Sequence, residues 1–140
     1  MRQLVKIAGA VAVTCALVAG VHSVAAHHSG TMFDPSKTVI IKGTVVELRW
    51  VNPHVSLSIN GTTKEGEEPA LWILEMSSPG NLVRSGGWRR DAVKPGDLVE
   101  AAMAPLRDGG KGGSLRKLTV IATGEVFTTN IREQERPGLE

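Results

Sequence analysis

The chain has 140 residues, of which 41% are hydrophobic and 21% are charged. This length fits one folded domain, and no internal repeat or low-complexity block indicates anything larger. The 16 basic and 14 acidic residues nearly balance, which excludes the strongly positive surface on which nonspecific nucleic-acid binding relies.

The first 26 residues have the three regions of a secretory signal peptide. Basic Arg2 and Lys6 come first, an apolar run follows over residues 7–21, and small residues lead to Ala26. The run is shorter than the roughly 20 residues of a membrane-spanning helix, so we expect no membrane span after cleavage. Cleavage would also remove Cys15 and bring the formal charge from +2 to zero. The expected location is therefore the periplasm or the secreted medium, with no nucleic-acid partner.

Three strands are expected in the first half of the domain. Residues 38–50 are rich in β-branched side chains and predict one long strand that bends or bulges at Gly43. Residues 55–59 alternate between apolar and polar, and Asn60-Gly61 behind them is a strong hairpin-turn signal. A solvated acidic loop over 64–68 would then lead to a third strand over 70–76.

A short helix and two further strands are expected in the second half. Ser78 before Pro79 is a typical helix start, and Gly86-Gly87 would end the helix. The tight turn at 94–97 leads to the fourth strand, residues 98–106. A glycine-rich hairpin tip over 108–113 precedes the fifth strand, residues 114–122, and residues 126–128 would extend the sheet.

This order of elements predicts an all-β domain with one short helix, specifically a five-stranded OB-like Greek-key barrel. A small β-sandwich is the alternative, because one sequence does not reveal strand pairing. The expected organisation is a signal peptide over residues 1–26, the barrel domain over 27–130 and a polar C-terminal tail over 131–140.

Several short motifs resemble a known family. They are Ala26-His27-His28-Ser29, Met32-Phe33-Asp34, Trp50-Val51-Asn52-Pro53-His54, Gly87-Trp88 and Lys94-Pro95-Gly96-Asp97. In this combination the chain resembles the small exported bacterial proteins grouped as domain-of-unknown-function family 6152. The resemblance implies export and a compact β domain, and it brings no established activity.

The paired histidines at the expected cleavage site are candidate metal ligands. Cleavage after Ala26 would make His27 the first residue, so that its α-amine and imidazole Nδ1 could chelate one metal ion. A third nitrogen from His54 or His28 would complete the planar, T-shaped set that Cu(II) prefers. Zinc is less favoured, because three histidines without a cysteine do not build its usual tetrahedral site.

Two alternatives stand beside this interpretation. Cleavage after Ala25 would place His28 third in the processed chain, where the amine, two backbone amides and the imidazole form a square-planar Cu(II) or Ni(II) site. The paired histidines are otherwise only a flexible polar end, and His54 only an exposed turn residue. Weak or outer metal partners are Met32, Asp34 and Glu75, which also have ordinary structural roles.

A second candidate site is a surface for an anionic ligand, where guanidinium groups surround an aromatic face. Its residues are Arg84, Trp88, Arg89 and Arg90. The alternative is a core tryptophan beside a solvated basic edge.

No nucleophile motif, phosphate-binding loop or carboxylate pair is found, so binding is favoured over catalysis. The expected function is that of an exported binding protein. The most specific version of this prediction is that the protein binds copper at its processed N-terminus. The alternative is a metal-free interaction module for an envelope protein or glycan.

Overall fold

The computed structural model describes residues 32–129. The predicted signal peptide, His27, His28 and the predicted tail over 131–140 lie outside these described residues. The strands and the helix, in chain order, are β1 (Val39–Arg49), β2 (Ser56–Thr62), β3 (Ala70–Glu75), α2 (Pro79–Gly86), β4 (Leu98–Pro105), β5 (Gly112–Val120) and β6 (Val126–Thr128).

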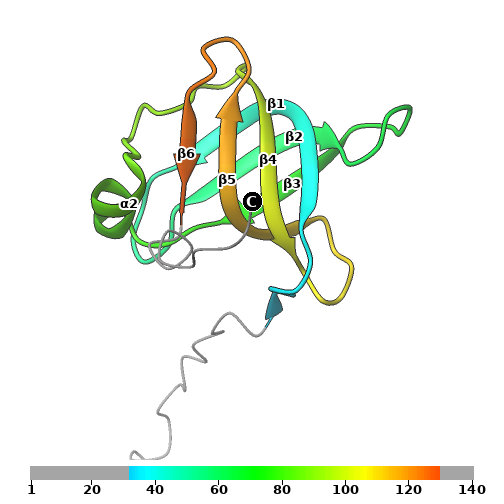
Figure 1. The fold of residues 1–140 in the computed structure, drawn as a ribbon, viewed down its shortest axis with the longest axis horizontal. Coiled ribbons are helices and arrows are strands. Elements are labelled where there is room, and N and C mark those ends of the chain that lie inside the picture. The colour runs from blue at the N-terminus through cyan, green and yellow to red at the C-terminus, as the bar shows by residue number, and fades with distance from the viewer. Residues whose placement is uncertain (1–31, 130–140) are drawn as a thin grey trace, which may run out of the picture.

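The strands form one sheet in the order β3-β2-β1-β4-β5-β6 (Figure 1). All neighbours in this order are antiparallel. A further parallel pairing joins Ile73–Glu75 of β3 to Gly112–Ser114 of β5 and closes the first five strands into a barrel. The prediction of an all-β, OB-like barrel with one short helix is therefore confirmed, and β6 adds a sixth strand beside β5.

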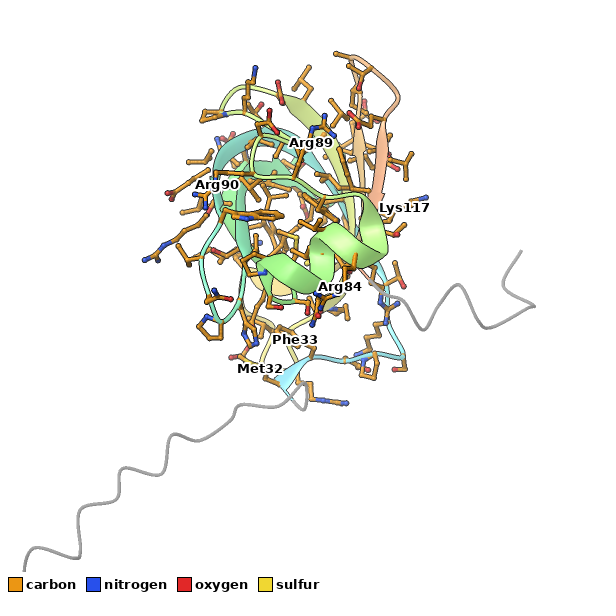
Figure 2. All side chains as sticks on the ribbon, turned by 90° about the vertical axis from the view of Figure 1, so that its left-hand side faces the viewer. Met32, Phe33, Arg84, Arg89, Arg90 and Lys117 are labelled. Atoms are coloured by element: carbon orange, nitrogen blue, oxygen red, sulfur yellow. The ribbon has the colours of Figure 1, made fainter. Side chains whose placement is uncertain are left out.

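The core follows from the alternation of apolar residues along each strand, since successive side chains point to opposite faces. In β2 and β3 the inward positions are fully or nearly fully buried, whereas Leu71 and Ile73 on the outer face are more than half exposed. Leu82 of α2 is also fully buried, and in Figure 2 the helix lies across the front of the barrel. The largest fully buried side chains are Trp88, Phe127, Ile41, Leu57, Ile59, Leu74, Leu82, Met103, Leu115 and Leu118.

The predicted helix start is confirmed. The N-cap is Ser78, whose hydroxyl accepts a hydrogen bond from the Asn81 backbone N–H, and Pro79 begins the helix. Gly87 ends it with a φ of 67°, in the left-handed region that favours glycine.

The hairpin turn predicted at Asn60-Gly61 is wrong. Both residues lie inside β2, where Gly61 pairs with Gly43 of β1 and with Ala70 of β3. Glycine is needed here so that β2 can approach β1 closely, and not for a turn. A Cβ atom on Gly61 would lie 2.5 Å from the carbonyl oxygen of Lys42. The chain turns later, through the exposed loop over residues 64–69.

The irregularity predicted at Gly43 lies slightly further along β1, where the register shifts between Val45 and Glu47. Gly43 itself is regular and close-packed. A Cβ atom there would collide with the carbonyl oxygen of Asn60 and lie 2.5 Å from the Cα atom of Gly61. The two glycines therefore let β1 and β2 cross at short range.

We expect Gly43→Ala to lower the free energy of unfolding by about 1–3 kcal/mol, because the added methyl group meets rigid backbone atoms. Urea unfolding followed by circular dichroism measures this change. Gly80→Ala is the matched control. Its methyl group meets only the end of the Arg84 side chain, at 3.5 Å, so helix propensity should keep or raise stability by up to about 1 kcal/mol. Equal stability of the two variants would contradict the close-approach explanation.

Candidate functional site

His54 lies two residues before β2, and its side chain contacts Glu75 at the end of β3. The Val55 N–H donates to the carbonyl of Ser77, and the Met76 N–H donates to the carbonyl of Val55. These two hydrogen bonds fix the backbone next to His54, which follows the cis Asn52-Pro53 peptide bond. The imidazole is thus attached to a strand end of the barrel and not to a long loop.

The His54 imidazole contacts a carboxylate. Its Nδ1 atom lies 2.5 Å from Oε1 of Glu75, and the two side chains are 54% and 37% exposed. With Nδ1 donating its proton to the carboxylate, a neutral imidazole carries its free electron pair on Nε2. Histidines that bind metals commonly have a carboxylate on their other nitrogen in this way.

His54 is the only histidine of the described part of the chain. Within residues 32–129, no group of three or more His, Cys, Asp or Glu side chains is placed to hold a metal ion. A metal site at His54 therefore requires donors from outside these residues. His27 and His28, the two other predicted ligands, lie there.

The other predicted outer partners, Met32 and Asp34, have different surroundings. They belong to a segment that pairs with the end of β4, where the Asp34 N–H donates to Pro105 and the Arg107 N–H donates to Met32. Figure 2 shows Met32 and Phe33 in this segment. Four residues lie between His27 and Met32, so their Cα atoms are five residue steps apart, which span at most about 17 Å. Any ligand set that includes His27 must lie within that reach of Met32.

Asp34 has a structural role in the segment that leads into β1. Its Oδ1 atom accepts hydrogen bonds from the Ser36 backbone N–H at 3.1 Å and hydroxyl at 2.6 Å, and Oδ2 lies 3.3 Å from Lys37 Nζ. The hydrogen bond from the Ser36 side chain, followed by the interaction with Lys37, lowers the pKa of Asp34 below its ordinary value. The carboxylate thus holds a turn together.

In the predicted anionic-ligand surface, Trp88 is a core residue. Its side chain is 1% exposed, and its ring centroid lies 4.8 Å from that of Phe127. The indole Nε1–H donates to the carbonyl of Thr128 at 2.9 Å. The ring therefore joins the segment after α2 to β6, and its face is covered by the protein.

The three arginines of this surface differ in their contacts. Arg89 binds the carboxylate of Glu125 with two nitrogen atoms, at 3.0 and 3.4 Å, and this hydrogen bonding raises the pKa of its guanidinium. Arg84 donates to the Asn81 side chain at 2.6 Å. Arg90 is exposed and forms no ion pair within the described part of the chain. Figure 2 shows Arg84 on α2, with Arg89 and Arg90 above it.

A groove of about 740 Å³, which no sequence signal predicts, lies at the other end of β2. It is lined by Ile40, Lys42, Thr62, Thr63, Lys64, Glu65 and Glu100. Its charges are of both signs, and Lys42 and Glu100 form an ion pair at 3.4 Å. No short motif reveals this groove, because its residues come together only through the pairing of β1 with β2 and β4.

The fold and the site define a small OB-like barrel that presents one carboxylate-held imidazole at a strand end. The chain belongs to a family of unknown function, DUF6152, whose model matches residues 13–116. Neither the curated proteins nor the solved structures gave a match. Within residues 32–129, no helix has the length and apolarity needed to cross a membrane.

We expect Asp34→Asn to lower stability at neutral pH, because the folded state then loses a charged acceptor. Since the folded pKa is depressed, the contribution of Asp34 is fully present above its unfolded pKa and disappears as the pH falls through the folded value. The difference in unfolding free energy from wild type should therefore shrink in acid. Glu68→Gln, in the exposed β2–β3 loop, is the control and should change little. A difference that is independent of pH would argue against the role given to Asp34.

Trp88→Phe should cost about 1–2 kcal/mol of unfolding free energy, because the carbonyl of Thr128 loses its donor while an aromatic ring remains beside Phe127. Thermal or urea unfolding measures the loss. Trp50→Phe removes an indole that is only partly buried and has no hydrogen bond within residues 32–129, so it should cost less. The opposite order would show that the hydrogen bond contributes little.

Proposed function

We propose that this is an exported binding protein of the periplasm or the secreted medium that holds one copper ion through its processed N-terminal histidine. Signal peptide cleavage after Ala26 gives His27 a free α-amine. The amine and Nδ1 of His27 supply two nitrogen donors, and Nε2 of His54 supplies the third. The observation that carries this proposal is the half-exposed imidazole of His54, which has one nitrogen on Glu75 and the other available to a ligand.

Copper fits this donor set better than other common metals. Three nitrogen atoms in one plane match the geometry of Cu(II), and the ion is the strongest binder of such ligands in its series. An α-amine has a reference pKa near 8, about two units below that of lysine, so a metal displaces its proton comparatively easily. The processed chain lacks cysteine, which removes the thiolates on which many zinc sites depend.

Cleavage after Ala25 would change the site and would also admit nickel. His28 would then be the third residue, and the amine, two backbone amides and its imidazole would bind Cu(II) or Ni(II) in a square plane without His54. The identity of the first residue decides between the two donor sets. Mass spectrometry of the exported protein gives that residue directly.

The processed protein should bind Cu(II) tightly at one ion per chain, as measured by titration. Addition of three residues before His27 should abolish this tight binding, because neither histidine then stands among the first three residues, where the α-amine and an imidazole can chelate one ion. In His54→Ala, electron paramagnetic resonance should show one nitrogen donor fewer. In His28→Ala, the control, the three-nitrogen spectrum should remain.

Unchanged affinity after the N-terminal addition would refute copper binding at the terminus. A wild-type spectrum from His54→Ala together with loss of a nitrogen in His28→Ala would assign the third donor to His28.

A further inference from the structure

We propose that the groove at the far end of β2 binds a free α-amino acid with an aliphatic side chain. The groove is lined by residues 40, 42, 62–65 and 100, and its volume of about 740 Å³ is within the usual range of small-molecule sites. Residues 62–65 are at the end of β2 opposite to His54. This site is therefore separate from the proposed copper site and does not depend on it.

The floor of the groove is fixed by the sheet. Lys42 of β1 pairs with Thr62 of β2 on one side and with Glu100 of β4 on the other, so these residues form one row across three strands. Ile40 lies two positions earlier on β1 and on the same face, and its side chain is 39% exposed. A ligand on this floor therefore meets an ion pair next to an aliphatic side chain, both held on rigid strands.

A second side of the groove is the start of the loop between β2 and β3, residues 63–65. Two hydrogen bonds hold this part of the loop. The hydroxyl of Thr63 donates to Oε2 of Glu67 at 3.1 Å, and the Glu67 N–H donates to the carbonyl of Lys64 at 3.4 Å. Within residues 32–129, Lys64 and Glu65 form no ion pair. The loop thus adds one unpaired charge of each sign to the groove.

The charges of the groove favour a zwitterion. Two lysines and two glutamates line it, so their formal charges sum to zero. Such a groove has little attraction for a simple anion or cation, whereas a molecule that carries both charges finds a partner for each. The Lys42–Glu100 pair can accept such a ligand, because an ammonium has three donors and a carboxylate has several acceptor positions. Its distance of 3.4 Å is also longer than the roughly 2.7–2.9 Å of a strong charged hydrogen bond.

The spacing of these charges indicates an α-amino acid. Its ammonium and carboxylate are attached to one carbon atom, and the charged groups of Lys42 and Glu100 likewise lie side by side. The carboxylate of the ligand can therefore approach Lys42 while its ammonium approaches Glu100. Lys64 and Glu65 supply a second partner of each sign from the loop. An aliphatic ligand side chain would lie on Ile40 and remove apolar surface from water.

An NMR titration of the processed protein with L-leucine, without added metal, tests this proposal. We expect saturable shifts of the backbone amide signals of the lining residues, Ile40 and Thr62 among them, and no shift at His54. Leucinamide lacks the carboxylate and N-acetylleucine lacks the ammonium. Each should bind at least about 10-fold more weakly, because charges of one sign in the groove are then left without a partner. Glycine, which has no side chain to cover Ile40, should also bind more weakly than leucine.

Two substitutions test the ion pair on the floor of the groove. Lys42→Met and Glu100→Gln each remove one charge and keep most of the side-chain length. Each should raise the dissociation constant for leucine by about 3- to 10-fold. Thermal unfolding of both variants should remain close to that of wild type, because the Lys42 and Glu100 side chains are 75% and 36% exposed.

Lys117→Met and Glu47→Gln are the matched controls. Both residues are exposed on strands of the same sheet, lie outside the groove and form no ion pair within the described part of the chain. The two control variants should bind leucine as wild type does.

The proposal is overturned if leucine causes no saturable shifts, or causes them only outside the groove. It is also overturned if leucinamide or N-acetylleucine binds as tightly as leucine, because recognition would then not require both charges. Equal weakening in Lys117→Met or Glu47→Gln would show that any change of surface charge suffices, and it would overturn the proposal as well. None of these results bears on copper binding, which the His54→Ala spectrum tests separately.

Discussion

The parallel pairing of Ile73–Glu75 with Gly112–Ser114 turns a curved sheet into a barrel. Without it, the outer edge of β3 and the first part of β5, which β6 does not cover, would be open sheet edges, which are sites of unwanted pairing between chains. The crossing is tight, since a Cβ atom on Gly112 would lie 2.9 Å from the carbonyl oxygen of Ile73. The same closure sets the position of Glu75, and Glu75 in turn holds His54. The geometry of the surface imidazole is thus a consequence of how the barrel closes.

Most of the fold was predictable because its signals are local. Alternation of apolar residues identified the strands, and the hydroxyl of Ser78 before Pro79 identified the start of α2. The failure at Asn60-Gly61 has a physical reason. Glycine serves both turns and close strand crossings, and only the partner strand, with Gly43 opposite, distinguishes the two uses. A barrel and a sandwich differ in which strands pair with each other. No single segment of the sequence contains that information, so the choice between the two folds could not be predicted.

The candidate site was predictable only in part. His54 stood out because the sequence contains few histidines, but its contact with Glu75 depends on the register between β2 and β3 across the β2–β3 hairpin. In the predicted anionic-ligand surface, composition alone did not show whether the Trp88 ring binds a ligand or packs in the core. Trp88 is buried because Phe127 and Thr128 of β6 cover it, and β6 is a short strand with little sequence signal of its own. Arg89 likewise has partners, Glu125 above all, that are distant in the sequence.

The exposed loop between β2 and β3 offers a practical point of attachment. It projects from the end of β2 opposite to His54, and nothing lies within 4 Å of a Cβ position on Gly66 at its tip (Figure 1). Exposed loop tips tolerate insertions well. A biotin-acceptor peptide placed in this loop would anchor the protein to a sensor surface with the His54 imidazole facing the solution. A tag at the amino terminus would instead block the α-amine that the proposed copper site requires.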